Sequence, residues 1–249
     1  MTTTDLTGAA AFMQAVRDLL DDIARTQAEA IDRAASAIVE SVRHDGTIFI
    51  FGSGHSHMLA EEGHYRAGGL ACVVPILVDP LMLHAGSIRS TAVERTMGLA
   101  EGVLKIYAPK PNDVLFVFSN SGVNAVPVEM ALAGKAAGMT VIAVIAAAYA
   151  EAAALGPVGR KLGEVADIVI DNKGIAGDAI VAVGDSGLRV GPTSTITGAF
   201  ILDAIITEVV ARLDAQGLPL PVYVSANIAG AADRNRELVA RYRERNPHL

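Results

Sequence analysis

The stretch Thr47-Ile-Phe-Ile-Phe51, followed by Gly52-Ser-Gly-His-Ser-His57, decides the fold of this chain. A continuous apolar and β-branched run predicts a strand buried on both faces, as in parallel sheets covered by helices. Small residues end the strand, and a helical pattern resumes directly after them, to about Ala67. A strand that passes through a short Gly/Ser loop into a helix is half of a βαβ unit, so the class is α/β.

Four further apolar runs alternate with helical segments, at residues 73–78, 114–118, 140–145 and 165–170. Right-handed crossovers between parallel strands put every strand-to-helix loop at one edge of the sheet. Ligands of such sheets bind outside the carboxyl ends of the strands. The loops at 52–57, 79–84 and 119–124 are therefore predicted to lie along one rim.

The remaining segments are predicted more coarsely. Residues 8–43 have helical periodicity and form either one helix approaching ~50 Å or two helices. Thr91-x-x-Glu94 resembles a capping box at a helix start. Segments 179–183 and 188–190 resemble a hairpin, an apolar helix runs from about 191 to Leu213, and an arginine-rich helix covers about 230–245.

Composition excludes several classes of protein. The chain has 249 residues and a net charge of −7, and only 4% of its residues are aromatic, which disfavours a nucleic-acid-binding surface. Cys72 is the one cysteine, so no intrachain disulfide forms, and we expect it to be a small core residue. Met1 to Ala10 has no signal-peptide pattern, and Met139 to Leu155 is shorter than the ~20 residues of a membrane span. We expect a cytoplasmic protein that binds neither nucleic acid nor membrane.

Hydroxyl-rich loops at two strand ends favour an anion site. Free backbone N–H groups and the helix dipole attract phosphate at a helix N-terminus, and serine hydroxyls add donors. The alternative is that these residues only cap helices. A dinucleotide is a rival ligand, because Gly52-x-Gly54 follows one strand and Asp79 ends the next, but His57 stands where the third glycine belongs. The hydroxyls of the two loops are Ser53, Ser56, Ser119 and Ser121, and Thr193, Ser194 and Thr195 open a third helix.

Three motifs together resemble the sugar isomerase (SIS) domain. They are Gly52-Ser-Gly-His-Ser, Phe118-Ser-Asn-Ser-Gly122 and Lys135-Ala-Ala-Gly-Met-Thr-Val-Ile-Ala143. Gly191-Pro-Thr-Ser-Thr-Ile-Thr-Gly-Ala-Phe-Ile-Leu-Asp-Ala resembles N-acetylmuramic acid 6-phosphate etherases, and the chain is also similar to phosphoheptose isomerases. His55-Ser-His-Met-Leu-Ala-Glu-Glu62 with Tyr65-Arg-Ala-Gly-Gly69 is similar to an uncharacterised branch of stand-alone SIS proteins.

The resemblance implies a three-layer αβα sandwich with a five-stranded parallel sheet of flavodoxin-like topology. It implies one SIS domain over 1–249, with a core at about 10–215 and a helical extension at 217–249. It also implies homodimers or homotetramers that share a phosphosugar site. Val123 and Asn124 depart from the family's usual acid or amide and threonine. The implied binding residues are Gly52, Ser53, Gly54, His55, Ser56, Ser119, Asn120, Ser121, Gly122, Asn124, Ser194 and Thr195.

Acid–base groups on the same rim give a candidate chemistry. Glu61 or Glu62 can move a proton in enediol isomerisation or elimination, and His84 can assist ring opening. The alternatives are a solvated helix face with a Glu62–Arg66 pair, or a metal held by His57, Glu61 and His64 at i, i+4, i+7 spacing. We expect a sugar-phosphate isomerase or lyase without an organic cofactor. The other hypothesis is a non-catalytic module that senses a sugar phosphate and regulates a partner protein.

Overall fold

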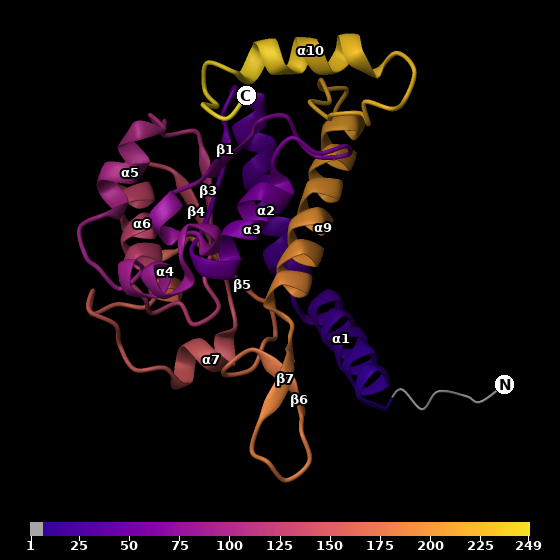
Figure 1. Ribbon diagram of the computed structural model, residues 1–249. Coiled ribbons are helices and arrows are strands. Elements are labelled where there is room, and N and C mark those ends of the chain that lie inside the picture. Colours follow the sequence, from indigo (N-terminus) through magenta and orange to yellow (C-terminus); the bar gives the residue numbers. More distant parts are fainter. Residues whose placement is uncertain (1–6) are drawn as a thin grey trace, which may run out of the picture.

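Five parallel strands form the central sheet in the order β2-β1-β3-β4-β5 (Figure 1). This computed structural model describes residues 7–249. The order is that of flavodoxin-like sheets, and the predicted sheet and topology are confirmed. The fifth strand begins three residues later than predicted. The strands are β1 (Ile48–Gly52), β2 (Val73–Ile76), β3 (Val114–Phe118), β4 (Thr140–Ile145) and β5 (Ile168–Asp171).

Helices cover both faces of the sheet and make three layers. Ile48 and Ile50 of β1 point into a core with α2 (Ala28–Arg43), α3 (Met58–Gly63) and α9 (Ser194–Ala215). Phe49 and Phe51 point into a second core on the opposite face. That core is covered by α5 (Ala100–Ile106), α6 (Ala125–Ala136) and α8 (Leu162–Val165). Because side chains alternate between the faces of a strand, a sheet with two cores needs continuous apolar runs.

The N-terminal helical segment is two helices. α1 (Thr7–Thr26) and α2 are separated at Gln27, whose side-chain Oε1 accepts the Asp171 N–H at 3.0 Å. α1 extends away from the body of the molecule (Figure 1), and Ile23 is its one buried residue. Residues 1–6, part of the stretch inspected for a signal peptide, lie outside the described residues.

Two predicted helix boundaries were wrong. The helix after β1 is short: a 3₁₀ turn, η1 (Gly54–His57), leads into α3, which ends at Gly63 because His64 is extended and the chain turns toward β2. The capping box at Thr91 does not exist, since Thr91 lies inside α4 (Ser87–Val93) and its hydroxyl donates to the Ser87 carbonyl. Two 3₁₀ turns, η2 (Asp79–Leu81) and η3 (Leu83–Ala85), precede α4.

The predicted hairpin is confirmed. β6 (Ala179–Ala182) and β7 (Arg189–Pro192) pair antiparallel and project from the body (Figure 1). The run at 139–155 is β4 followed by α7 (Ala147–Ala152), and Cys72 is buried just before β2. Within residues 7–249, no helix combines the length and apolar character needed to cross a bilayer.

The C-terminal residues run along the outer edge of β2. α10 (Ala231–Tyr242) is three residues shorter at its end than predicted. After it, the Asn246 amide donates to the Val73 carbonyl at 3.2 Å, and His248 Nε2 lies 3.1 Å from the Tyr107 hydroxyl. Arg245 pairs at 2.6 Å with Asp113, whose carboxylate is fully buried before β3. The tail at 245–248 is therefore held to β2, to the end of α5 and to the residue before β3.

Candidate functional site

The two serine loops begin side by side. β1 and β3 are neighbours, and Gly52 is in register with Phe118. Ser53 follows Gly52 and Ser119 follows Phe118, and both serines are buried. Ser53 and Ser119 are 66 positions apart in the sequence, and the parallel pairing of β1 with β3 brings their loops together.

The β1 loop is closely folded. A Cβ on Gly52 would lie 2.3 Å from the Ser56 carbonyl oxygen, and Gly54 has a φ of +57°, so both positions favour glycine. The Ser56 N–H donates to the Ser53 carbonyl at 3.0 Å, and the ring of buried His57 contacts the Gly54 carbonyl. Both α4 and α9 contact the turn at 54–57.

The β3 loop leads to the start of α6. The Gly122 N–H donates to the Ser119 hydroxyl at 3.3 Å, and Gly122 has a φ of +63°. Asn124 is extended before the helix, and its side chain does not cap it. Within residues 7–249, the side chains of Ser121 and Asn124 have no hydrogen-bond partner in the protein, so their donors are available to a ligand.

Glu94 links the β1 loop to α6, the helix that follows the β3 loop. Its carboxylate Oε2 accepts the Ser53 hydroxyl at 2.9 Å, and its backbone carbonyl accepts the Val126 N–H of α6 at 3.0 Å. Its side chain is 16% exposed. The interpretation of Glu94 as a capping residue missed this position. The available signal was its place after the second strand, on the side of the sheet where the loops meet.

His57, Glu61 and His84 come together at one end of the site. His57 Nε2 is 3.7 Å from a Glu61 carboxylate oxygen, and the His57 and His84 rings are 6.3 Å apart. Glu62 pairs with Arg66, as the solvated-face alternative expected. His55 is exposed on the same loop, two residues before His57.

The third member of the hypothetical metal triad is elsewhere. His64 follows the end of α3, and its ring lies 6.3 Å from that of His248 on the C-terminal tail. Burial and the neighbouring His248 lower the pKa of His64, and burial lowers the pKa of His248. In the described part of the chain, no three His, Cys, Asp or Glu side chains are grouped to hold a metal ion.

The start of α9 is already occupied by a carboxylate. Asp178 accepts the backbone N–H groups of Thr193 at 3.0 Å and Ser194 at 2.8 Å. It also accepts the Ser194 hydroxyl at 2.7 Å. Ser194 is therefore engaged by the protein itself, whereas Thr195 makes no side-chain hydrogen bond among residues 7–249. This role of Asp178 was also missed, since nothing in its local sequence indicates it.

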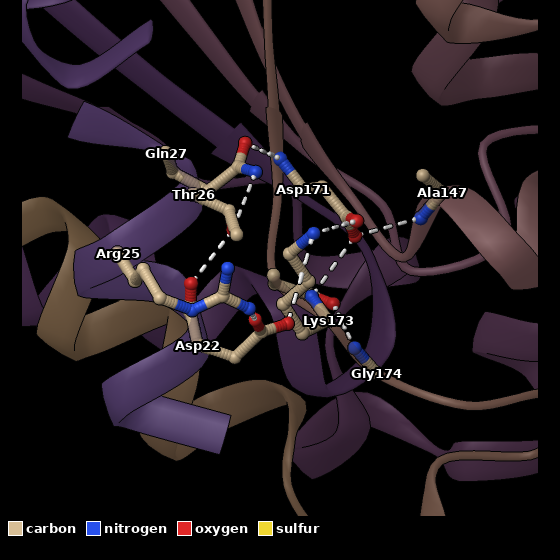
Figure 2. Close-up of polar contacts among 9 residues, drawn as sticks. Asp22, Arg25, Thr26, Gln27, Ala147, Asp171, Lys173 and Gly174 are labelled. Atoms are coloured by element: carbon tan, nitrogen blue, oxygen red, sulfur yellow. Dashed lines mark hydrogen bonds and ion pairs between the residues drawn. The ribbon is translucent and has the colours of Figure 1, made fainter. Parts of the chain in front are cut away.

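A polar turn after β5 is hydrogen-bonded to the β3 loop. The Asn172 amide nitrogen donates to Asn120 Oδ1 at 3.0 Å, and the Gly174 N–H donates to Asn172 Oδ1 at 2.8 Å. The turn is held by Asp171, which accepts the N–H groups of Ala147 at 3.0 Å and Lys173 at 2.9 Å (Figure 2).

Comparison with known proteins agrees with this architecture. The chain is similar to two solved phosphoheptose isomerases, both at 17% identity. For that of Neisseria gonorrhoeae the TM-score is 0.51, with 85% of this chain and all of the other covered. For that of Francisella tularensis it is 0.54, with coverages of 83% and 98%. At this identity the likeness shows the fold alone.

Sequence relatives extend over most of the chain. A UPF0309 protein of Brucella anthropi is 48% identical over 222 residues, which are 89% of this chain and 90% of that protein. A UPF0309 protein of Brucella canis is 46% identical over 219 residues, which are 88% of this chain and 89% of that protein. The family profile described as the SIS domain matches residues 11–146. The motifs, the parallel sheet and these matches agree, and the chain belongs to the SIS domain family.

Proposed function

We propose that the chain binds a sugar phosphate at the carboxyl ends of β1 and β3 and acts on it as an isomerase or lyase by proton transfer. The observation that carries the proposal is the Glu94 carboxylate, which is hydrogen-bonded to Ser53 of the β1 loop. A carboxylate beside an anion-binding loop suits the removal of a proton from the carbon next to a sugar carbonyl.

The phosphate group is assigned to the β3 loop. Ser121 and Asn124 supply free side-chain donors, and α6 begins there with its N-terminal N–H groups and dipole. Ser53 has a different task in this proposal, because its hydroxyl holds Glu94. The tight glycine turns allow a ligand to approach the backbone of both loops.

The proton-transfer groups are assigned around the sugar. Glu94 is the proposed base, and His57, Glu61 and His84 are the groups available at the β1 end of the site. A neutral or protonated imidazole is suited to ring opening near neutral pH. Glu62 is the weaker candidate, because its side chain is 36% exposed and paired with Arg66, whereas that of Glu94 is 16% exposed and bonded to Ser53 as well as to Arg95. The two isomerases that share the fold make isomerisation the first reaction to test.

A sensing role is the second candidate function. Val183, Leu188 and Val190 on the projecting hairpin are exposed apolar residues, which suit contact with a partner protein.

The amphipathic helix α1 leaves Met13 53% exposed, which supports the proposal of a homodimer or homotetramer. Light scattering on the purified chain measures that oligomeric state.

The test combines binding and exchange. A thermal-shift panel of hexose 6-phosphates, 2-amino-hexose 6-phosphates and heptose 7-phosphates, each beside its unphosphorylated sugar, identifies the ligand. A ligand at 100 times its Kd adds about 2.7 kcal/mol of stability. The best binder is then incubated with the protein in deuterated water. Incorporation of deuterium next to the carbonyl supports an enzyme, binding without incorporation supports the sensor, and no binding by any phosphate contradicts both.

A further inference from the structure

We propose that Asn172 is a positioning residue, which orients the side-chain amide of Asn120 so that its nitrogen donates to a bound sugar phosphate. The inference rests on the proposed function, since Asn120 belongs to the β3 loop. Asn172 follows β5 and is only 4% exposed, so it does not itself line the open side of the loop.

The polarity of this pair is fixed by a backbone group. The Gly174 N–H can only donate, so the Asn172 atom 2.8 Å from it is the amide oxygen. The Asn172 nitrogen therefore faces Asn120, and the atom that receives it at 3.0 Å is Asn120 Oδ1. As a result, the NH₂ group of Asn120 points away from Asn172. The Asn120 backbone carbonyl is fixed as well, by the Ala146 N–H at 3.0 Å.

The turn that carries Asn172 has little freedom. A Cβ on Gly174 would lie 2.9 Å from Asn172 Oδ1 and 3.3 Å from Asn120 Oδ1. Lys173 has a φ of +60°, and its ammonium group lies 3.2 Å from Asp171 and 3.8 Å from Asp22 of α1 (Figure 2). Gln27 accepts the Asp171 N–H from the other side. The amide relay is thus anchored to β5, to α1 through Asp22 and to Gln27 between the two N-terminal helices.

The relay leaves one donor for a ligand. Among residues 7–249 the Asn120 nitrogen has no protein acceptor, and its neighbours in the loop are Ser119 and Ser121. A phosphate or sugar oxygen accepts hydrogen bonds, so this orientation attracts it. The reversed orientation would present Asn120 Oδ1 to the same anion and repel it.

Asn172→Asp reverses the polarity. A carboxylate only accepts, so it receives the Gly174 N–H and also draws the Asn120 NH₂ toward itself. Asn172→Ala removes the orienting group without imposing the opposite one. With the best sugar phosphate of the panel, and with inorganic phosphate, calorimetry should give Kd values that rise from wild type to N172A to N172D. The N172D increase should be at least about tenfold, because hydrogen bonds to charged groups are worth about 1.5 kcal/mol or more.

Asn235→Asp is the matched control. Asn235 lies on α10. Its side-chain amide donates to the Val224 carbonyl at 2.7 Å and accepts the Val224 N–H at 3.0 Å. N235D therefore adds the same charge and disturbs a similar amide pair outside the rim. Its Kd for the sugar phosphate should stay within about twofold of the wild type.

A ligand-free measurement separates this inference from the proposed function. The side-chain NH₂ signal of Asn120 in ¹H–¹⁵N spectra, assigned by its loss in N120A, should shift in N172D and not in N235D. An unshifted signal, or equal Kd values for N172A and N172D, overturns the positioning role even if the wild type binds sugar phosphate. A signal that shifts in N172D, together with a wild type that binds no sugar phosphate, overturns the proposed function and the donor role, while the orientation itself stands.

Discussion

The Ser53 hydroxyl donates a hydrogen bond to the Glu94 carboxylate at 2.9 Å, which links the loop after β1 to the end of α4. The Glu94 backbone carbonyl also accepts the Val126 N–H of α6. One residue therefore connects the β1 loop to α6, the helix that follows the β3 loop.

Glu94→Gln should lower deuterium incorporation into the substrate by about 100-fold or more, the range typical of a lost general base. The amide oxygen of glutamine still accepts the Ser53 hydroxyl, so the fold is preserved. The rate is measured by NMR with the best-binding sugar phosphate in deuterated water.

Glu129→Gln is the control for that experiment. Glu129 lies on α6, and its carboxylate accepts the Gly98 N–H at 2.8 and 2.9 Å. E129Q should exchange at the wild-type rate. Full exchange by E94Q would assign the base to Glu61 or to a histidine of the rim instead.

Gly52→Ala should abolish sugar-phosphate binding and lower the free energy of unfolding by about 1–3 kcal/mol, as overpacking does. Its Cβ would lie 2.3 Å from the Ser56 carbonyl oxygen, so the β1 loop has to move. Gly102→Ala, inside α5 with nothing within 4 Å of the added Cβ, should instead raise stability by up to about 1 kcal/mol. Urea unfolding and calorimetry measure both variants, and normal binding by G52A would show that the loop conformation is not needed.

Asp113→Ala should lower the free energy of unfolding by about 3–5 kcal/mol, the cost of breaking a buried ion pair. Asp113 is fully buried and accepts the Thr47 N–H at 2.8 Å. Its removal would leave Arg245 without its carboxylate partner. Asp233→Ala removes an exposed partner of Arg236 and should change stability by less than about 1 kcal/mol. Comparable urea midpoints for the two variants would contradict the importance of the buried pair.

Acid should destabilise the protein through His64 and His248. Their pKa values are lowered by folding, so the unfolded chain binds more protons and stability falls as the pH drops below the ordinary value of 6.5. The free energy of unfolding should therefore be lower at about pH 5.5 than at about pH 8, which lie on either side of that value. The double variant H64Q/H248Q should flatten this dependence, and H44Q, on the exposed end of α2, should not. A steep dependence that survives in H64Q/H248Q would place its origin in other groups.

The sequence predicted the sheet well because its signals are local. Apolar runs and Gly/Ser loops, such as Gly52–His57, are read directly along the chain, and the strand order then brings the serine loops together. The positions of Glu94, Asp178 and Asn172 were not predictable in this way. Each acts through a partner far along the chain: Ser53, Ser194 and Asn120 respectively.

The error at His64 has a different cause. The i, i+4, i+7 spacing from His57 through Glu61 assumed a helix to about Ala67, but α3 ends at Gly63. A helix of six residues cannot be distinguished from a longer one by periodicity when its neighbours are also polar. Tertiary structure decided the boundary, since the chain has to reach β2.

The tail along β2 has a consequence for behaviour in concentrated solution. β2 is an edge strand of the sheet, and the free backbone groups of an uncovered edge strand can form hydrogen bonds with a strand of another molecule. Asn246 donates to the Val73 carbonyl at that edge, and the bond of His248 to Tyr107 holds the end of the tail beside it. Weakening these contacts would expose the edge strand to pairing with another molecule. Aggregation, rather than reversible unfolding, would then be the first sign of damage there.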